Sequence, residues 1–400
     1  MDSLYFTEEH RFFRDSFRDF LQKEVVPHIE KWEETGTIDR FIWEKMGEMG
    51  YFGISYPEAF GGMDLDIFYL VIYLEELQRV RSGGFAAAMW VHPYLAMTHI
   101  LAEGSEAIKD RYLPDSIAGK KIGCLCITEP FGGSDVSGMR TTAIKDGDEW
   151  VINGEKIYVT DGERSDTLVV WATLDKSLGK AAIKSFIVEK GTPGCEVTRL
   201  EHKMGIRASD TAAITFSDCR VPRENILGSP DIATDAESRK KAFGGVMQTF
   251  DNTRPPVAAM AIGVARAALD LAEELLAAEG VTLDYDRKPV NLSALEAALY
   301  EMEADWQAAR LLVQKAAWMA DNRQPNSMEA SMCKAKAGRM GNEVTLRCVE
   351  LCQGLGYSEQ HLLEKFARDS KILDIFEGTQ QIQQLIVARR LLGKSSSELK

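Results

Sequence analysis

The sequence predicts an α+β protein in which a small β region separates two helical regions. Apolar residues recur at helical spacing up to Ala118, short β-rich runs follow Gly119, and long alanine- and leucine-rich stretches return after Asp235. A chain of 400 residues is long enough for two or three domains. We therefore expect an N-terminal helical domain over 1–120, a middle β-barrel-like domain over 121–232 and a C-terminal four-helix bundle over 233–400.

The N-terminal region starts with a helix signal. Thr7 can accept a backbone hydrogen bond as the capping residue, and two glutamates follow in the first turn. Further helical runs are expected over 67–77 and 85–102, after a loop at Gly61-Gly62. The first helix should bury one apolar face, made of Phe13, Phe17, Phe20 and Leu21.

The middle region shows the pattern of short strands. Residues 150–159 are typical of a hairpin, because Asn153-Gly154 can supply the positive φ angles of a tight turn. Three more β-rich runs predict strands at 167–172, 183–188 and 212–216. An apolar run from Ile122 to Ile127 precedes the densest cluster of turn residues.

The C-terminal region predicts long helices joined by short connections. Their expected ranges are 236–278, 293–321, 327–355 and 380–392. Four helices of this length with short loops favour a bundle.

Charge and composition exclude several classes of partner. The formal net charge of -14 repels phosphate backbones and anionic lipid, so neither nucleic acid nor a membrane is the expected partner. No stretch of 18 uninterrupted apolar residues occurs. The first residues, Met1-Asp2-Ser3-Leu4, lack the pattern of a signal or transit peptide, and we expect a cytoplasmic location.

Neither a metal site nor a covalent nucleophile is indicated. The 7 cysteines are an odd count without metal-type spacing, which favours reduced, buried thiols. The 6 histidines are scattered. No Gly-x-Ser-x-Gly motif occurs, and no cysteine stands in a basic setting. Proton abstraction by a carboxylate remains as the expected chemistry.

The candidate base is Glu377, in the segment Ile375-Phe376-Glu377-Gly378-Thr379. A carboxylate between apolar residues and a glycine could act as a general base, because burial raises its pKa and its basicity. The alternative is an ordinary acidic residue near a helix start, where the helix dipole favours it.

Two other clusters are candidate binding segments. The run Thr128-Glu129-Pro130-Phe131-Gly132-Gly133-Ser134-Asp135 could bring free backbone amides to a ligand, or could be a plain strand-end turn. Phe250-Asp251-Asn252-Thr253-Arg254-Pro255-Pro256 could place an acid and an arginine beside the bundle core, or could be a helix break with solvated charges.

Together these segments resemble the acyl-CoA dehydrogenase family over about Phe6 to Gly393. The resemblance implies an FAD-dependent α,β-dehydrogenation of an acyl-CoA thioester to the enoyl-CoA. The landmarks occur in order along the chain: Pro57 to Gly62, Thr128 to Asp135, Tyr158-Val159-Thr160-Asp161-Gly162, His202 to Gly205, Asp210-Thr211-Ala212, Phe250 to Arg254 and Phe376 to Thr379.

By this resemblance Glu377 matches the base that removes the α-proton while a hydride leaves the β-carbon for the flavin. The forming negative charge would meet the amide of the base itself and a hydroxyl of FAD, an oxyanion-hole arrangement. The resemblance also implies electron-transferring flavoprotein as the acceptor, a homotetramer, and a place in fatty acid and lipid metabolism.

The resemblance assigns further residues by position. Those expected along the flavin ring are Leu125, Ile127, Thr128, Gly133 and Ser134 on one side and Tyr158, Val159 and Thr160 on the other. Thr379 and Gln381 match contacts to the adenine half of FAD. Substrate contacts are expected from Ser134, Asp251, Arg254 and Gly378.

Two motifs depart from the family pattern. Residues 282–289 lack the Arg-x-x-Phe-Gly that meets the FAD pyrophosphate from a neighbouring subunit, and Glu350 to Gly356 replaces Gln-x-x-Gly-Gly-x-Gly. Losing such an arginine typically weakens binding by about 1.5–3 kcal/mol. Either Arg287 or Lys288 substitutes from a shifted position, or a different partner subunit supplies the contacts in a heteromer.

Alternative functions stay open at this point. An acyl-CoA oxidase or a reductase running the same step backwards would share these motifs. A cofactor-poor subunit that binds acyl-CoA and supports a partner is a third possibility, favoured by the two departures. The aromatic cluster at Trp90-Val91-His92-Pro93-Tyr94 favours a short, branched or cyclic acyl group over a long one.

Overall fold

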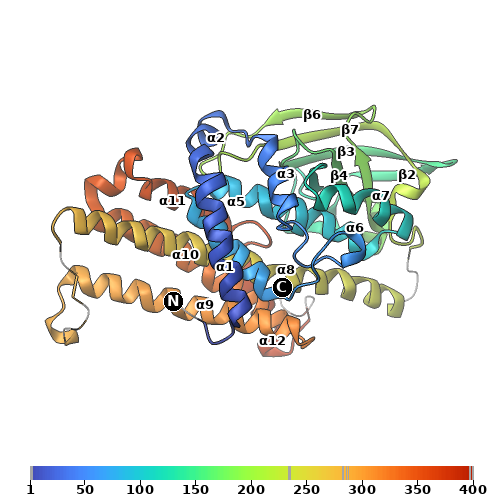
Figure 1. Ribbon diagram of the computed structural model, residues 1–400. Coiled ribbons are helices and arrows are strands. Elements are labelled where there is room, and N and C mark those ends of the chain that lie inside the picture. Colours follow the sequence, from blue (N-terminus) through green and yellow to red (C-terminus); the bar gives the residue numbers. More distant parts are fainter. Residues whose placement is uncertain are drawn as a thin grey trace.

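The computed structural model describes residues 3–232, 236–281, 283, 284, 286, 288–395 and 398, with residues 236–250, 252 and 289 described by their backbone alone. Three residues of the altered motif at 282–289, namely Thr282, Tyr285 and Arg287, therefore lie outside the residues whose structure is described. Figure 1 shows the three regions: N-terminal helices in the centre, the sheet beside them, and long C-terminal helices along the base.

The N-terminal region is helical, and the Thr7 cap is confirmed. The backbone amide of His10 donates to Thr7 Oγ1 at 3.3 Å, and the amide of Thr7 donates to His10 Nδ1 at 3.0 Å. The helices are α1 (Glu8–Phe20), α2 (Ile29–Thr35), α3 (Arg40–Glu48), α4 (Ile67–Leu77), α5 (Gly83–Trp90), α6 (Met97–Glu103) and α7 (Glu106–Ile117).

The expected single helix over 85–102 is divided. A π-helical turn, η5 (Val91–Ala96), separates α5 from α6 and contains Pro93. Proline has no backbone N–H to donate, so a wider turn is a common way to continue a helix through it.

The middle region is a sheet of eight strands. Along the sheet the order is β6-β7-β3-β2-β4-β5-β8, and β1 pairs in parallel with β4. Their bounds are β1 (Gly123–Cys126), β2 (Thr142–Asp146), β3 (Glu149–Thr160), β4 (Thr167–Thr173), β5 (Ile183–Glu189), β6 (Cys195–Leu200), β7 (Thr211–Pro222) and β8 (Ile226–Leu227). The strands expected at 167–172, 183–188 and 212–216 are confirmed.

The hairpin expected at Asn153-Gly154 is wrong, because β3 runs straight through both residues. Gly154 has a φ of 150° and sits at a bulge, where an added Cβ would lie 2.4 Å from Thr141 Oγ1. The glycine thus serves a close approach between strands. The real hairpin turns at Gly147, whose φ is 61°, between the paired residues Asp146 and Glu149.

The C-terminal region contains the four predicted helices and one more. They are α8 (Ala236–Ala278), α9 (Ala294–Asp321), α10 (Ser327–Tyr357) and α12 (Gln380–Leu392), and the extra helix is α11 (Leu363–Ser370). Figure 1 shows α9 and α10 running side by side. The indole N–H of Trp306 donates to the carbonyl of Ile262 at 2.9 Å and joins α9 to α8.

The two helical regions share one hydrophobic core, to which the sheet contributes Val169, Trp171 and Ile187, and the sheet also has a second core of its own. A buried ion pair between Arg310 on α9 and Glu75 on α4, 2.9 Å apart, crosses the shared core. One described segment, Thr253–Ala278, is long and apolar enough to cross a membrane, but most of it is buried in this core. It is the central helix of the bundle.

Candidate active site

The candidate base lies in a strained turn. Glu377 and Gly378 follow the 3-10 turn η11 (Lys371–Asp374) and directly precede Thr379, the cap of α12. Both have positive φ angles, 56° and 92°. The φ of Gly378 favours glycine, and an added Cβ would lie 2.4 Å from Gln383 Nε2, which would have to move. A non-glycine residue with positive φ is typical of functional sites.

Side chains from two helices hold this turn. Gln383 Nε2 donates to the carbonyls of Glu377 (3.1 Å) and Gly378 (3.2 Å). Lys334 Nζ, from α10, donates to the same Gly378 carbonyl at 2.8 Å. Thr379 Oγ1 accepts the amide of Ile382 and starts α12. The turn is therefore fixed on both of its carbonyls.

The carboxyl of Glu377 is desolvated, as expected for a base. Burial raises its pKa from 4.5 to about 7, and the charges of Lys334 and Arg254 act in the opposite direction. Burial in turn lowers the pKa of Lys334 from 10.5 to about 8. A carboxyl poised near neutral pH suits general base catalysis. The residue as a whole is partly buried. The raised pKa of its carboxyl favours the reading as a base over that of a solvated acid near a helix start.

The charge of Arg254, which pairs with Asp251, acts on the Glu377 carboxyl. Arg254 is 5% exposed, forms an ion pair with Asp251, and donates to Ser331 Oγ at 3.4 Å. These residues are not solvated charges at a helix break, because α8 continues through Pro255 and Pro256. The structure places Arg254 in the surroundings of Glu377. Its contact with a coenzyme A arm stays a prediction.

The loop expected along the flavin ring is anchored by a buried ion pair. Glu129 accepts the amides of Arg140 (2.7 Å) and Thr141 (2.9 Å) and pairs with Lys156 Nζ at 2.8 Å. Lys156 also donates to the carbonyl of Ile127. The outer part of the loop, from Phe131 through Gly133 and Ser134, is exposed. Its base is fixed while its tip is open to a ligand.

The remaining predicted contacts divide into exposed and buried ones. A bulge in β3 gives Tyr158 a φ of 57° and leaves it 62% exposed, whereas the side chain of Val159 packs inside the sheet's core. Leu125, Ile127, Thr128 and Thr160 are partly buried, and Gln381 is exposed. Any contact from Val159 must come from its backbone.

His92 belongs to the core and not to a substrate chamber. Its Nε2 bonds to the carbonyl of Ser116 at 3.0 Å, and its Nδ1 accepts the amide of Gly123 at 2.9 Å. Burial lowers its pKa to about 4, so the ring is neutral. Trp90 and Tyr94 are buried beside it. His92 is therefore a packed core histidine.

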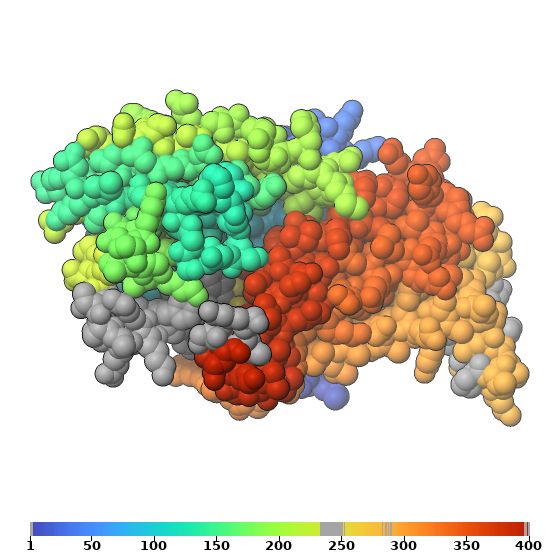
Figure 2. Space-filling view, turned by 180° about the vertical axis from the view of Figure 1, so that it is seen from behind, coloured from blue at the N-terminus to red at the C-terminus, as the bar shows by residue number. Residues whose placement is uncertain are grey.

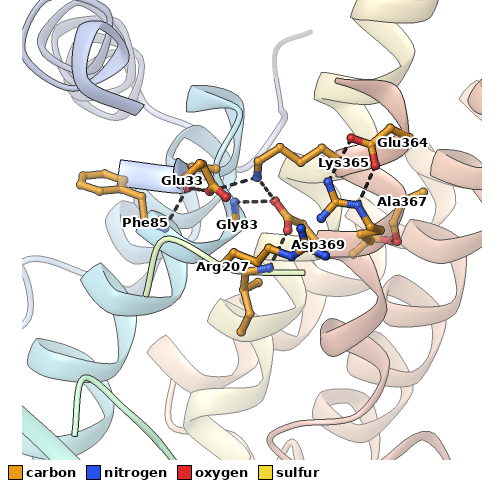
Figure 3. Close-up of polar contacts among 12 residues, drawn as sticks. Glu33, Gly83, Phe85, Arg207, Glu364, Lys365, Ala367 and Asp369 are labelled. Carbon is orange, nitrogen blue, oxygen red and sulfur yellow. Dashed lines mark hydrogen bonds and ion pairs between the residues drawn. The ribbon is translucent and has the colours of Figure 1, made fainter. Parts of the chain in front are cut away.

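A second polar cluster joins the three regions next to the site (Figure 3). Asp369 on α11 accepts the amide of Gly83 at 3.0 Å and that of Ile206 at 2.6 Å, and pairs with Lys365. Lys365 also pairs with Glu33 of α2 at 3.0 Å. We call these residues the Asp369 junction. It fixes α11, and α11 leads through η11 to Glu377.

Residues at the start of α12 and in the 128–135 loop fit a bound cofactor. Figure 2 shows the surface hollowed where the middle sheet, in green, meets the C-terminal helices, in red. Within the described part of the chain, the Oε1 atoms of Gln380 and Gln383 are buried acceptors without a protein donor, so a ligand could satisfy them. The backbone of Gly133 lies close to Thr128, since a Cβ added to Gly133 would lie 3.2 Å from Thr128 Cγ2.

The altered motif at 350–356 does not fit the family's anionic cofactor half as well. Glu350 adds a carboxylate there and pairs with Arg347 at 2.6 Å. Gln353 has a φ of 51° and a ψ of -123°, a conformation natural to glycine. The chain therefore keeps the residues expected along the flavin ring and departs from the family pattern in the motif expected near the anionic half of the cofactor.

Three residues of the site were absent from the sequence prediction: Lys334, Gln383 and Lys156. Lys334 carried a signal, because it shares a helix face with the small residues Ala330, Ala337 and Gly338. A lone lysine on a buried face is rare unless it has a task. Gln383 and Lys156 act on residues that only the fold brings near.

The fold and site define a class of protein: a three-region α+β protein with a carboxyl of raised pKa held in a strained turn of its C-terminal region. The family profiles of the acyl-CoA dehydrogenase N-terminal, middle and C-terminal domains match residues 7–120, 124–219 and 243–392. The chain belongs to the acyl-CoA dehydrogenase family and is an oxidoreductase of flavoprotein type.

Similar proteins cover almost the whole chain. The mouse (Mus musculus) mitochondrial short-chain specific acyl-CoA dehydrogenase is 34% identical over 98% of this chain and 92% of its own. Subunit CarC of the caffeyl-CoA reductase-Etf complex of Acetobacterium woodii is 35% identical over 98% of this chain and 100% of its own. The structure of butyryl-CoA dehydrogenase from Megasphaera elsdenii matches with a TM-score of 0.87, 32% identity, and coverage of 98% and 100%.

Proposed function

We propose that the protein dehydrogenates an acyl-CoA thioester between its α- and β-carbons, with Glu377 as the base. The observation that carries this proposal is the desolvated carboxyl of Glu377, held in a strained turn beside two buried cations. A carbon acid next to a thioester needs a base of raised pKa. FAD, when bound, supplies the acceptor for the hydride.

The protein's own groups act on the proton and on geometry. Above its pKa of about 7 the Glu377 carboxyl is ionised and can accept the α-proton. Gln383 and Lys334 hold the carbonyls of the turn, so the carboxyl keeps one position during proton transfer. The loop anchored by Glu129, with the exposed Ser134 at its tip, would lie along the flavin ring and the acyl group.

A short acyl group is the proposed substrate class. The relatives named for short-chain and butyryl substrates support it by their likeness to this chain. A series of acyl-CoA thioesters of increasing length, titrated against bleaching of the flavin band, tests this. Preferential bleaching by long chains would refute the substrate class while leaving the reaction in place.

Electron-transferring flavoprotein is the proposed electron acceptor, and the similarity to CarC, a reductase subunit named with Etf, supports it. The same similarity favours a second candidate, the reverse reduction of an enoyl thioester. Measuring both directions with the same protein decides between them. Peroxide formation during aerobic turnover would instead indicate an oxidase.

We also propose that the chain forms a homo-oligomer, a dimer of dimers, through its bundle helices. A mostly apolar groove of about 570 Å³ lies between α9, α10 and α12, with Leu312, Met332, Val387 and Leu391 among its lining residues. Light scattering on the purified chain measures the oligomer. Full flavin content in the chain purified alone would exclude the heteromer that the altered motifs suggested.

A further inference from the structure

Lys334 is a buried lysine with an unusual set of partners. Its Nζ donates to the carbonyl of Gly378, 2.8 Å away, and no described carboxylate lies within 4.0 Å of it. Its neighbours along the buried face of α10 are small: Ala330, Cys333 and Ala337. A buried ammonium without a close counter-ion is costly, and an apolar side chain would fill this space more cheaply.

The charge of Lys334 acts on the base. Among the charged groups around Glu377, Lys334 has the largest effect in favour of the ionised carboxyl and Arg254 the second largest. Arg254 already has a partner in its ion pair with Asp251, whereas Lys334 has only a backbone carbonyl. The titratable groups on the elements packed here are Asp251 and Arg254 on α8, Cys333 and Lys334 on α10, Asp374 on η11 and Arg390 on α12.

We propose that Lys334 is a positioning residue for the reaction: it holds the turn that carries Glu377 through the Gly378 carbonyl, and its ammonium keeps the Glu377 carboxyl ionised at neutral pH. This inference rests on the proposed function for its catalytic meaning. The hydrogen bond and the charge are separable, because glutamine can keep a donor without the charge.

The pH dependence follows from the directions of the two shifts. Burial raises the pKa of Glu377 to about 7 and lowers that of Lys334 to about 8, so both groups are charged between these values. Below this window the base is protonated, and above it the ammonium loses its proton. Removing the charge of Lys334 therefore moves the acid limb of activity to higher pH.

The test compares Lys334→Met, Lys334→Gln and Lys334→Arg with the wild type. Lys315→Met is the matched control, because Lys315 is exposed on α9 and pairs with Glu329 at 3.6 Å, outside the site. The first readout is the midpoint of the Glu377 carboxyl band in infrared difference spectra against Glu377→Gln. The second is the pH profile of kcat/KM with a short acyl-CoA.

We expect the midpoint to rise by about one pH unit or more in Lys334→Met and Lys334→Gln, and to stay near the wild-type value in Lys334→Arg and Lys315→Met. At pH 7 the two uncharged variants should lose about fivefold or more in kcat/KM and recover as the pH rises. Lys334→Gln should keep more activity at high pH than Lys334→Met, because it keeps a donor for Gly378.

An unmoved carboxyl midpoint in both uncharged variants overturns the inference. If Lys334→Met does not fold, the pair Lys334→Gln and Lys334→Arg decides by the same criterion. The infrared measurement needs no turnover. If the midpoint shifts in the variants but no acyl-CoA bleaches the flavin of the wild type, the role of Lys334 in keeping Glu377 ionised is supported and the proposed function is refuted.

Discussion

At the scale of single residues, Glu377 links the chemistry to the stability of the protein. Its folded-state pKa of about 7 lies above the ordinary value of 4.5, so the folded chain binds this proton more tightly than the unfolded chain. The contribution of Glu377 to stability is therefore greatest below pH 4.5 and falls as the pH rises to about 7. The ionised carboxylate of the proposed base thus lowers the stability of the fold at the pH where the proposed reaction needs it.

Glu377→Gln should remove the pH dependence of stability that comes from this carboxyl. It should also abolish reduction of the flavin by acyl-CoA. Relative to the wild type, the variant should gain about 2.5 kcal/mol in the free energy of unfolding between pH 5 and pH 8, from the size of the shift in the pKa of Glu377. Urea titrations at the two pH values measure it. If the stability difference between the variant and the wild type is the same at pH 5 and pH 8, or if acyl-CoA bleaches the flavin of the variant as it does that of the wild type, then Glu377 is not the base.

Asp161 is a second buried carboxyl, at the end of β3 in the segment expected beside the flavin. It is 0% exposed, neither of its oxygens has a hydrogen-bond partner in the described structure, and Arg164 Nε lies 3.7 Å away while bonding to Asp210. Burial raises its pKa from 3.8 to about 8. Its ionisation opposes folding as the pH rises through that range.

Asp161→Asn should therefore stabilise the protein, and more at pH 8 than at pH 5. Removing a buried carboxylate that has no hydrogen-bond partner is expected to contribute roughly 1–3 kcal/mol. Thermal melting at both pH values measures the effect. The matched control is Asp19→Asn, on the exposed side of α1, which should change little at either pH. A destabilised Asp161→Asn would show that the ionised acid has a task in the fold.

At the scale of elements, the loop of residues 127–141 depends on the Glu129–Lys156 pair. Lys156 is 0% exposed, so removing its partner leaves a buried ammonium uncompensated. Glu129→Gln should cost about 3–5 kcal/mol and lower the flavin content of the purified protein. The double variant Glu129→Gln with Lys156→Met should recover part of the stability but not the flavin. Stability and flavin content equal to wild type in the single variant would contradict the anchoring role.

The sequence predicted regular elements well where local signals agree. Ser293 caps α9 through the amide of Glu296, and α12 begins and ends where expected, because capping residue and apolar spacing point to the same ends. Asn153-Gly154 misled because the same pair suits a turn or a bulge, and only the neighbouring strand decides. The short, highly charged α11 gave no long periodic signal.

The candidate site was predictable in part for the same reason. Glu377 stands out because a carboxylate, a glycine and a helix cap are adjacent in sequence. Lys334 and Gln383 donate to backbone carbonyls. Because every residue has a backbone carbonyl, the sequence does not show which one will be bound. Which buried lysine meets which carbonyl is decided by the packing of α10 against α12, a property of the fold.

At the scale of the whole molecule, the Asp369 junction decides whether the three regions behave as one body. Figure 3 shows Asp369 and Lys365 facing Gly83 and Glu33 from the opposite region. Gly83 has no room for a side chain, since an added Cβ would lie 2.8 Å from Asp369 Cβ. One carboxylate thus fixes α5, the loop at Ile206 and α11 together.

Asp369→Ala should loosen this connection and the site with it. Two buried amides lose their acceptor and Lys365 loses one of its two carboxylates, so the cost is expected to be about 3–5 kcal/mol. Because the sheet has its own core, calorimetry should show its melting separate from that of the helices. Asp305→Asn, which breaks the exposed pair with Lys336, is the control and should cost less than about 1 kcal/mol.

The activity of Asp369→Ala then shows whether the junction reaches the base. α11 runs into η11 and the Glu377 turn with no loop between them, so a displaced α11 moves the carboxyl away from its substrate. We expect kcat to fall more than flavin content, because the loop anchored by Glu129 is untouched. A single melting transition with unchanged kcat would mean that the shared helical core alone holds the three regions in place.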